Sequence, residues 1–386
     1  MSTSNESTVT DPLSTPMPEP MPTPMPTPTP IQDPLLKGIV GLQNMGSTCY
    51  ANSVIQLLRA IPEWNTFCLR ETFEECCPDK DSVQAKLLLA YQDLLRSMWS
   101  AYRPAYVRPM GFLSVIRDSV KNTVYDYFGK RMQNDSHEYL VYLLDNFHEA
   151  LNEQRGAPVL EQPASATPLS QTDLARQGWA AFQARHKSPV IDLFFGMMRK
   201  MIVCGKCSAK SYQWETFNVF KIPCDVVGGS LLEWCRNECK PTDLDDYDCT
   251  ACKQNGDGRQ KAQILSHVWQ LPSSLFVSLR RFQPDGRKTM TACASIQGLV
   301  SFADVFAPES DHPSKDWTYE CRAVVDHHGS HSGGHYSTQM AHPVTNQWWW
   351  MDDAMSAPLP QGPRFGTSNY ILYFRRKIEL AAAKEA

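Results

Sequence analysis

The spacing of apolar residues changes once along the chain, and this change limits the folds that the chain can adopt. Before residue 151, apolar positions recur at helical spacing and predict helices over residues 48–60, 83–100 and 135–151. After about residue 190, they form short β-prone runs separated by turn residues. These runs lie around residue 203 and over residues 212–220, 262–269, 275–281, 319–325, 336–341, 348–351 and 370–374. Helices followed by many strands predict an α+β fold.

Three segments do not share this patterning. Residues 1–34 hold ten of the 28 prolines and are predicted to be a disordered tail, although short PxxP spacings also allow docking to a proline-binding domain. Residues 154–175 are rich in Pro, Ala, Ser, Thr and Gln and predict a surface loop. We therefore expect one folded domain over residues 35–376 and a short tail over residues 377–386.

Composition excludes several classes of protein. Hydrophobic residues make up 42% of the 386 positions, which is enough for a sizeable core. The net charge is −4, and residues 1–36 hold four acidic residues and no Lys or Arg, so the rest is formally neutral. This argues against nucleic acid or an anionic membrane as the main partner. No apolar run could span a bilayer and no secretion signal is evident, so we expect a soluble protein of the cytoplasm, the nucleus or both.

Cysteine usage points to chemistry rather than to disulfides. The 13 cysteines include two CxxC pairs, Cys204/Cys207 and Cys249/Cys252, separated by positions 208–248. In a chain of this length, metal binding or thiol catalysis is favoured over a disulfide framework. Four thiolates can close a tetrahedral shell around Zn²⁺, and such closed sites are structural. Cys235 and Cys239 form an additional CxxxC pair that could confuse the ligand assignment.

Cys49 lies where the first helical pattern begins. A thiolate there would be favoured by the positive end of the helix, and Ser47 or Thr48 is available as the cap. The side-chain amide of Asn44 and the backbone N–H of Cys49 could together hold an oxyanion. On these grounds alone, an inert buried thiol is the more frequent explanation for such a cysteine.

A candidate base and carboxylate follow far along the chain. His335 opens a predicted strand after two glycines, and Asp352 and Asp353 follow an aromatic strand. Cysteine, histidine and aspartate are the three parts of a thiol-protease triad, which would then lie between the two lobes. Histidines also crowd residues 327–335, and clustered imidazoles could instead bind a metal. The members of that group are His327, His328, His331 and His335.

The segment of residues 41–56 closely resembles the cysteine box of the ubiquitin-specific proteases, a family of papain-like deubiquitinating enzymes. The shared positions are Gly41, Leu42, Asn44, Gly46, Thr48, Cys49, Tyr50, Asn52, Ser53 and Gln56. Ser47 stands where the family usually has Asn. The segment Gly333-Gly-His335-Tyr, followed by an aromatic strand and Asp352-Asp353, resembles the family's histidine box. Blocks at residues 133–144, 192–196 and 271–282 extend the resemblance over about residues 38–376.

The resemblance implies a helical thumb, a β-rich palm and β-strand fingers, about residues 197–262, with structural zinc held by the four CxxC cysteines. It implies Cys49 as nucleophile, His335 as general base and acid, and Asp352 as the carboxylate that orients the imidazole. Asn44 would stabilise the oxyanion, and Asp353 would assist. Choosing between the two aspartates is the weakest part of this assignment.

The expected activity is thiol-dependent hydrolysis of the bond after the last glycine of ubiquitin, with ubiquitin and ubiquitinated proteins as partners. Three alternatives stay open. The chain could process a ubiquitin-like modifier, because the catalytic boxes do not exclude that. It could be an inactive ubiquitin-binding module, although the intact triad argues against this. It could also be a zinc-bearing scaffold that recruits partners through the proline-rich tail.

Overall fold

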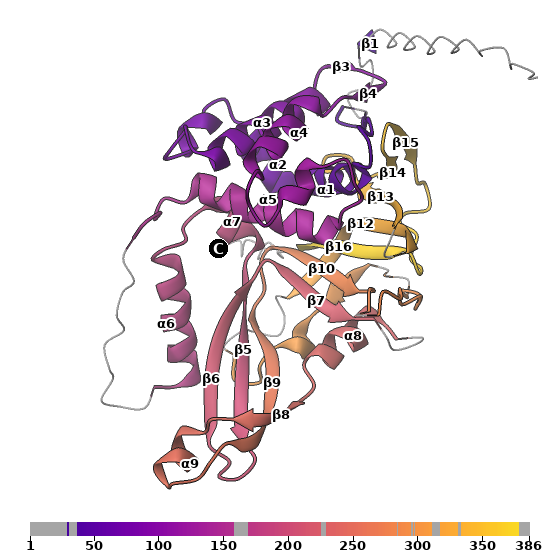
Figure 1. Ribbon diagram of the computed structural model, residues 1–386. Coiled ribbons are helices and arrows are strands. Elements are labelled where there is room, and N and C mark those ends of the chain that lie inside the picture. Colours follow the sequence, from indigo (N-terminus) through magenta and orange to yellow (C-terminus); the bar gives the residue numbers. More distant parts are fainter. Residues whose placement is uncertain are drawn as a thin grey trace, which may run out of the picture.

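The computed structural model describes residues 29–30, 37–157, 169–224, 229–283, 285–294, 296, 298–310, 317–330 and 333–377. The predicted disordered tail lies almost wholly outside the described residues, as do half of the predicted loop and nearly all of the C-terminal tail. Within the described residues the chain combines a helical part with two large sheets (Figure 1). The prediction of an α+β fold is confirmed.

Five α-helices form the N-terminal helical part. They are α1 (Cys49–Arg59), α2 (Pro62–Cys68), α3 (Val83–Met98), α4 (Met110–Ser119) and α5 (Ser136–Leu151). The three predicted helices correspond to α1, α3 and α5. The other two were not predicted, because α2 is short and α4 buries only Phe112 and Ile116. Two short 3₁₀ helices, Phe73–Cys76 and Asp126–Gly129, lie between them.

Local signals explain where these helices begin. Asp135 caps α5 by accepting hydrogen bonds from the backbone N–H groups of His137 and Glu138. Ser82 caps α3 in the same way. Pro62 follows α1 closely and starts α2, since proline is well tolerated in the first turn of a helix, where its missing N–H has no intrahelical role.

The chain between the helical part and the sheets is more ordered than predicted. Helix α6 (Gln171–Gln183) begins inside the predicted loop, where Ser170 caps it, so the loop prediction is wrong from residue 171 onward. Helix α7 (Pro189–Phe194) follows and is capped by Ser188. Farther along the chain lies α8 (Leu231–Glu238), whose capping box joins Ser230 and Glu233.

The larger sheet has eight strands and carries the late part of the chain. Its order is β15-β14-β13-β12-β16-β10-β7, with β11 paired to β12. The strands are β7 (Val219–Pro223), β10 (Ser274–Arg280), β11 (Leu299–Ser301), β12 (Thr318–Ser330), β13 (Gly333–Ala341), β14 (Trp348–Asp352), β15 (Met355–Pro358) and β16 (Asn369–Arg376). Helix α1 packs against β13, and α8 packs beside β7. Short pairs join β1 (Thr29–Pro30) to β3 (Tyr102–Arg103) and β2 (Gly41–Leu42) to β4 (Tyr106–Val107).

A four-stranded sheet extends away from the rest of the molecule in Figure 1. Its order is β6-β5-β9-β8, with β5 (Gly196–Cys204), β6 (Lys210–Phe217), β8 (Thr242–Tyr247) and β9 (Gln260–Gln270). The short helix α9 (Thr250–Gln254) lies at its far end. The predicted run 212–220 is two strands rather than one, because β6 and β7 belong to different sheets. Strand β8 has no apolar alternation and was missed.

Buried histidines should make the helical part sensitive to acid. Burial lowers the pKa of His137 to about 3 and that of His148 to about 4, while an unfolded histidine has a pKa near 6.5. The unfolded chain therefore binds more protons than the folded chain between these values, and stability falls as the pH drops from about 6.5 to 4. We expect a loss on the order of several kcal/mol, measured as the urea midpoint against pH.

A variant separates this effect from that of the other acid-sensitive groups. His137→Gln should flatten the pH dependence of the urea midpoint, while the contribution of every other group stays the same in both proteins. Equal slopes for the two proteins between pH 7 and pH 4 would contradict the assignment.

Candidate active site and cysteine cluster

Helix α1 carries Cys49 as its first residue and rests on the large sheet. The hydroxyl of Thr338, on β13, donates a hydrogen bond to the backbone oxygen of Ser53 over 2.9 Å. Cys49 is 1% exposed. The helical part thus supplies the thiol, and the strand that begins with Gly333 and Gly334 runs beside it. The predicted position of the site between two lobes agrees with this arrangement.

His335 and Asp352 meet across neighbouring strands. The imidazole Nε2 of His335 is hydrogen-bonded to Oδ1 of Asp352, which is the last residue of β14. A carboxylate at Nε2 places the proton there and leaves Nδ1 to act as base. Within the described residues, no hydrogen bond joins Cys49 to His335. The structure therefore brings base and carboxylate together and leaves the thiol close by but unpaired with the base.

The environment of Cys49 favours the neutral thiol. Burial raises its pKa above the ordinary value, and the negative charge of Asp353 raises it further. Backbone N–H groups of Tyr336, Tyr50 and Cys49 itself oppose this by stabilising the anion. The helix N-terminus alone does not make the thiolate dominant, contrary to the simplest expectation from sequence. Formation of the ion pair requires the imidazole of His335 to approach the thiol.

Asp353 has a different set of partners from Asp352. Its carboxylate accepts hydrogen bonds from the side-chain amides of Asn44, at 2.9 Å, and Asn52, at 2.7 Å. Its backbone oxygen accepts from the N–H of Leu42 at 2.7 Å. These bonds hold Asp353 at φ 46°, a left-handed conformation that costs a non-glycine residue about 1–3 kcal/mol. The sequence identified Asn52 only as part of the family resemblance. Its hydrogen bond to Asp353 shows what its side chain does in the structure.

The loop before Cys49 is organised by the side chain of Asn44. Its Oδ1 accepts from the backbone N–H groups of Gly46 and Thr48. One N–H of the Asn44 amide donates to Asp353. The second N–H can donate to an oxyanion. Thr48 precedes the helix but makes no side-chain cap bond, so the expected cap is absent at this terminus. Ser47 adopts φ 56°, a region that Asn, the usual family residue, enters more readily.

Gly41 allows the two halves of the site to touch. A Cβ on Gly41 would lie 2.2 Å from the backbone oxygen of Ala354 and 2.6 Å from that of Asp353. Both distances are far below van der Waals contact. Only glycine lets β2 approach the β14–β15 turn this closely.

Gly41→Ala is therefore expected to push the aspartate turn away from Cys49. We expect a loss of about 1–3 kcal/mol in the free energy of unfolding from overpacking, and a fall of about 100-fold in kcat/KM from misplacement of the triad. Denaturant unfolding and hydrolysis of a fluorogenic ubiquitin substrate measure the two effects. Gly258→Ala is the control for substitution itself, since Gly258, like Gly41, has no positive φ but has no atom near its Cβ position. Equal activity of the two variants would contradict the argument.

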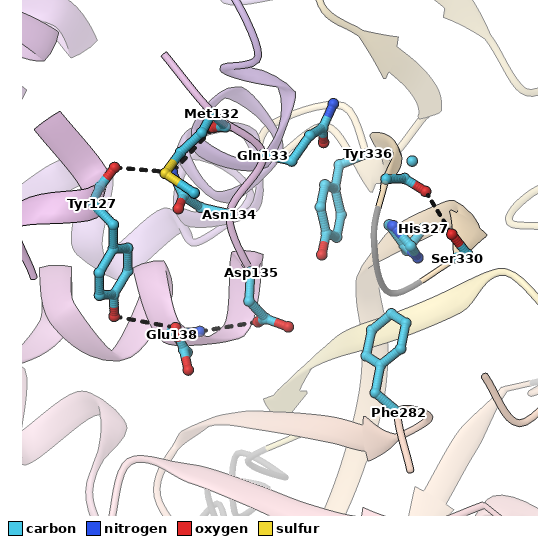
Figure 2. Close-up of a pocket in the computed structure, with 12 residues that line it drawn as sticks. Tyr127, Met132, Gln133, Asn134, Asp135, Glu138, Phe282, His327, Ser330 and Tyr336 are labelled. Atoms are coloured by element: carbon cyan, nitrogen blue, oxygen red, sulfur yellow. Dashed lines mark hydrogen bonds between the residues drawn. The ribbon is translucent and has the colours of Figure 1, made fainter. Parts of the chain in front are cut away.

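A cavity of about 490 Å³ lies next to His335, between the helical part and the sheet. Figure 2 shows Asp135 and Glu138 on one side of it and Phe282, His327 and Tyr336 on the other. Asp135 Oδ2 accepts a hydrogen bond from the hydroxyl of Tyr370, and Glu138 accepts one from Tyr127. The lining residues are Tyr127, Met132, Gln133, Asn134, Asp135, Glu138, Phe282, His327, Ser330, Gly333, Gly334 and Tyr336. The sequence could not show that Glu138 faces a cavity.

The two glycines before His335 have different structural reasons. A Cβ on Gly334 would lie 2.4 Å from Nε2 of His327, so the buried imidazole requires a glycine there. A Cβ on Gly333 would meet nothing within 4 Å, so this position is open toward the cavity. His327 lies among aromatic rings and beside Lys288, whose Nζ is 3.1 Å from its Nδ1. Among described residues, His327 and His328 join no metal-binding group, and His331 is not described.

Four cysteines converge at the far end of the four-stranded sheet. The Sγ atoms of Cys204 and Cys252 are 3.8 Å apart, and those of Cys207 and Cys249 are 3.6 Å apart. Tetrahedral Zn²⁺ with bonds of about 2.3 Å requires sulfur–sulfur separations of about 3.8 Å. The four predicted ligands are therefore arranged as a zinc shell would need. Cys235 and Cys239 pack in the hydrophobic core near α8 instead.

The fold and this site define the class of the protein. A buried cysteine at the start of a helix, a strand-borne histidine with its carboxylate and a four-cysteine fingers sheet are the arrangement expected for a papain-like thiol hydrolase of the ubiquitin-specific protease type. The family model of the ubiquitin carboxyl-terminal hydrolases matches residues 40–374. The chain therefore belongs to this family.

Known proteins of similar sequence carry the same description. The chain is 26% identical to ubiquitin carboxyl-terminal hydrolase 2 of Rattus norvegicus over 344 residues, covering 88% of this chain and 54% of that protein. It is 24% identical to ubiquitin carboxyl-terminal hydrolase 21 of Homo sapiens, covering 88% and 61%. The chain thus spans less than two thirds of the length of either relative.

Solved structures share the fold. The SAGA DUB module of Ubp8, Sgf11, Sus1 and Sgf73 bound to monoubiquitin contains a chain with a TM-score of 0.68 and 20% identity. The match covers 91% of this chain and 71% of that one. A second structure of the module, bound to ubiquitin aldehyde, gives a TM-score of 0.67 at 18% identity. No helix within the described residues is long and apolar enough to cross a membrane.

Proposed function

We propose that this chain is a cysteine-type deubiquitinase that hydrolyses the peptide or isopeptide bond after the C-terminal glycine of ubiquitin. The observation that carries the proposal is that Cys49 begins α1, which packs against β13, while His335 of β13 pairs with Asp352 of β14. The residues on both sides of His335, Gly334 and Tyr336, line a cavity with acidic side chains. The family membership supports the proposal. So do two structures of the same fold, in which the DUB module is bound to ubiquitin or ubiquitin aldehyde.

The proposed reaction starts from a neutral thiol. His335 Nδ1 takes the proton of Cys49, and the thiolate attacks the carbonyl carbon of the last glycine. The free amide N–H of Asn44 and the backbone N–H of Cys49 hold the oxyanion. His335 then gives the proton to the departing amine and afterwards activates the water that hydrolyses the thioester. Asp352 keeps the imidazole in the required tautomer throughout.

Asp353 has a supporting role in this proposal. It touches the amides of Asn44 and Asn52 rather than the imidazole, so it orients the oxyanion donor. Its charge also disfavours a thiolate at Cys49 until the imidazolium is formed beside it. Both effects act through other groups, so Asp353 is a positioning residue.

We propose that the acid-lined cavity receives the ubiquitin tail, which ends in Leu-Arg-Gly-Gly. Asp135 and Glu138 on one wall offer carboxylate oxygens to the tail arginine. The open side of Gly333 leaves room for the backbone of the two tail glycines. The aromatic side chains of Phe282 and Tyr336 form the opposite wall and narrow the cavity (Figure 2). A tail with larger residues at the two terminal positions would not fit next to His335.

We propose that the four-cysteine cluster holds a structural Zn²⁺. The sulfur separations suit zinc, and all four thiolates are used, so the ion has no open position for substrate. By joining β5 and the turn after it to the residues around α9, the ion would stiffen the far end of the fingers sheet. This surface would then contact the globular part of ubiquitin.

The test of the function is covalent labelling with ubiquitin that carries a C-terminal electrophile. We expect an adduct with the full chain and none with Cys49→Ala, whereas Cys321→Ala, which removes a buried thiol outside the site, should still react. A probe made from a ubiquitin-like modifier runs beside it. An adduct with that probe alone would move the function to the modifier, and no adduct from folded, zinc-loaded protein would contradict catalysis.

Two further expectations remain proposals. We propose that the proline-rich segment of residues 1–34 recruits a proline-binding partner, because its PxxP spacings suit such domains. Deleting residues 1–34 should then remove the partner and leave labelling by the ubiquitin probe unchanged.

We also propose that the protein works in the cytoplasm or nucleus, where reducing conditions preserve a catalytic thiol and zinc thiolates. Imaging of the full chain in cells tests this.

A further inference from the structure

A second group of metal-binding side chains lies where α5 meets the segment between α6 and α7. It consists of His148 and Glu149, near the end of α5, and His186, which follows α6. The candidate ligand atoms of the three residues all lie within 4.8 Å of one another. The group shares no residue with the active site or with the four cysteines.

His148 is buried and already oriented as a metal-binding histidine would be. Its Nδ1 is 2.8 Å from the hydroxyl of Ser188, and its Nε2 is 3.0 Å from Nδ1 of His186. A histidine ligand usually donates its second ring N–H to such an oxygen, which fixes the tautomer. In the tautomer that carries its proton on Nδ1 and donates it to Ser188, His148 directs the lone pair of Nε2 toward His186. Burial keeps this imidazole neutral at pH 7, as a ligand must be.

His186 is held in place by a rigid backbone contact. The side chain of Asn152 donates to the backbone oxygen of Arg185 at 2.9 Å and accepts from the N–H of Lys187 at 3.0 Å. The ring of Phe182 stacks on His186 with a centroid distance of 4.6 Å. The residues on both sides of His186 are thus tied to the end of α5. Two imidazoles on fixed backbone segments form a site that needs little rearrangement to bind an ion.

Glu149 supplies a third ligand from the exposed side. Its Oε1 is 3.8 Å from Nε2 of His148, and its side chain is 40% exposed. Zinc bonds of about 2.0–2.2 Å to nitrogen and oxygen require ligand separations of about 3.3–3.5 Å. The two separations measured at Nε2 of His148, 3.0 and 3.8 Å, lie on either side of this value. A small shift of the Glu149 side chain completes a shell of three protein ligands.

We propose that His148, Glu149 and His186 form a second binding site for a divalent transition metal such as Zn²⁺. In the bound form, His186 carries its proton on Nε2 and offers the Nδ1 lone pair to the ion. Water fills the remaining position. The ion links the end of α5 to the start of α7, which leads directly into β5 and the fingers sheet. Its expected role is to stabilise the junction between the helical part and the fingers.

The test measures metal binding to the full chain whose four-cysteine site is already filled with zinc. Titration with Zn²⁺ in a calorimeter should show one further equivalent, and zinc analysis after desalting should give two ions per chain. Cys49→Ala must keep the further equivalent, because this variant excludes an ion held by the catalytic thiol. Glu153→Gln is the matched control, since Glu153 is a neighbouring exposed carboxylate that pairs with Lys187.

His186→Asn should abolish the further equivalent, and Glu149→Gln should weaken it by about tenfold or more. Added Zn²⁺ should raise the Tm of the zinc-loaded parent chain and of Glu153→Gln, but not that of His186→Asn. The proposal would be overturned if the parent chain bound no zinc beyond the ion at the four cysteines. A second equivalent that survives in His186→Asn would also overturn it. Circular dichroism of His186→Asn without added metal shows whether this variant is folded. If His186→Asn is unfolded, the zinc affinity of Glu149→Gln tests the proposal instead, because the side chain of Glu149 is partly exposed.

Discussion

Asp352→Ala is expected to lower kcat/KM for a ubiquitin substrate by about 10³–10⁴-fold, which is the scale on which loss of the orienting carboxylate acts in other triads. The reason is direct contact. Asp352 is the residue whose carboxylate holds Nε2 of His335, and without it the imidazole loses both its tautomer and its position. Ubiquitin binding should change little, since Asp352 does not line the cavity. Steady-state hydrolysis and a separate binding measurement with catalytically inactive protein separate the two quantities.

Asp353→Ala is the matched comparison, because it removes the same group one residue later. It frees Asn44 and Asn52 but leaves the His335–Asp352 bond intact. We therefore expect a smaller fall in kcat/KM, of about 10–100-fold, which does not exceed the loss caused by removing an oxyanion donor. The pH profile of Cys49 alkylation should move to lower pH in Asp353→Ala, because a negative charge that raises the pKa of the thiol is removed. A larger loss of activity in Asp353→Ala than in Asp352→Ala would reverse the assignment.

Loss of the zinc ion that we propose at the four cysteines should have the largest effect on stability. Structural zinc contributes on the order of 10 kcal/mol of binding free energy that is coupled to folding. Cys204→Ser removes one buried ligand, so we expect zinc content to fall from one ion to none at the four-cysteine site. The β5, β8 and β9 strands should then lose protection from hydrogen exchange. The helical part should keep most of its protection, because the hydrophobic core that it shares with the large sheet contains no residue of β5, β8 or β9.

Cys239→Ser is the control for this experiment. Cys239 lies between the two CxxC pairs in sequence but packs against the core near α8, with its thiol directed to the backbone oxygen of Val305. It should keep zinc and protected fingers. Zinc loss in Cys239→Ser, or unchanged zinc content in Cys204→Ser, would show that the ligand set is wrong. A chelator applied to the parent chain should reproduce the effect of Cys204→Ser.

Much of the fold could be predicted because local signals were strong. The helical spacing before residue 151 predicted α1, α3 and α5, and Asp135 marked the start of α5. Helices with weak periodicity were missed, since α2 has only 7 residues and α4 buries only two side chains. The run 212–220 was predicted as one strand because nothing local shows that the chain passes from one sheet to another between β6 and β7.

The site was only partly predictable. The residue types of a thiol triad are recognisable from sequence, and the cysteine and histidine boxes placed them at Cys49, His335 and Asp352. Which aspartate touches the imidazole depends on the side-chain alternation of β14 and on the left-handed turn at Asp353. Those are properties of paired strands, so two adjacent aspartates could not be separated without them.

The sequence by itself determined the chemistry that the chain can perform. A cysteine at a helix start, a histidine at a strand start and two CxxC pairs are local patterns, because each depends on a few neighbouring residues. Only the tertiary structure decided which groups meet. It paired His335 with Asp352, assigned Asp353 to Asn44 and Asn52, and brought His148 to His186. These contacts join residues far apart in the chain, and their distances follow from the packing of whole elements, which no local pattern encodes.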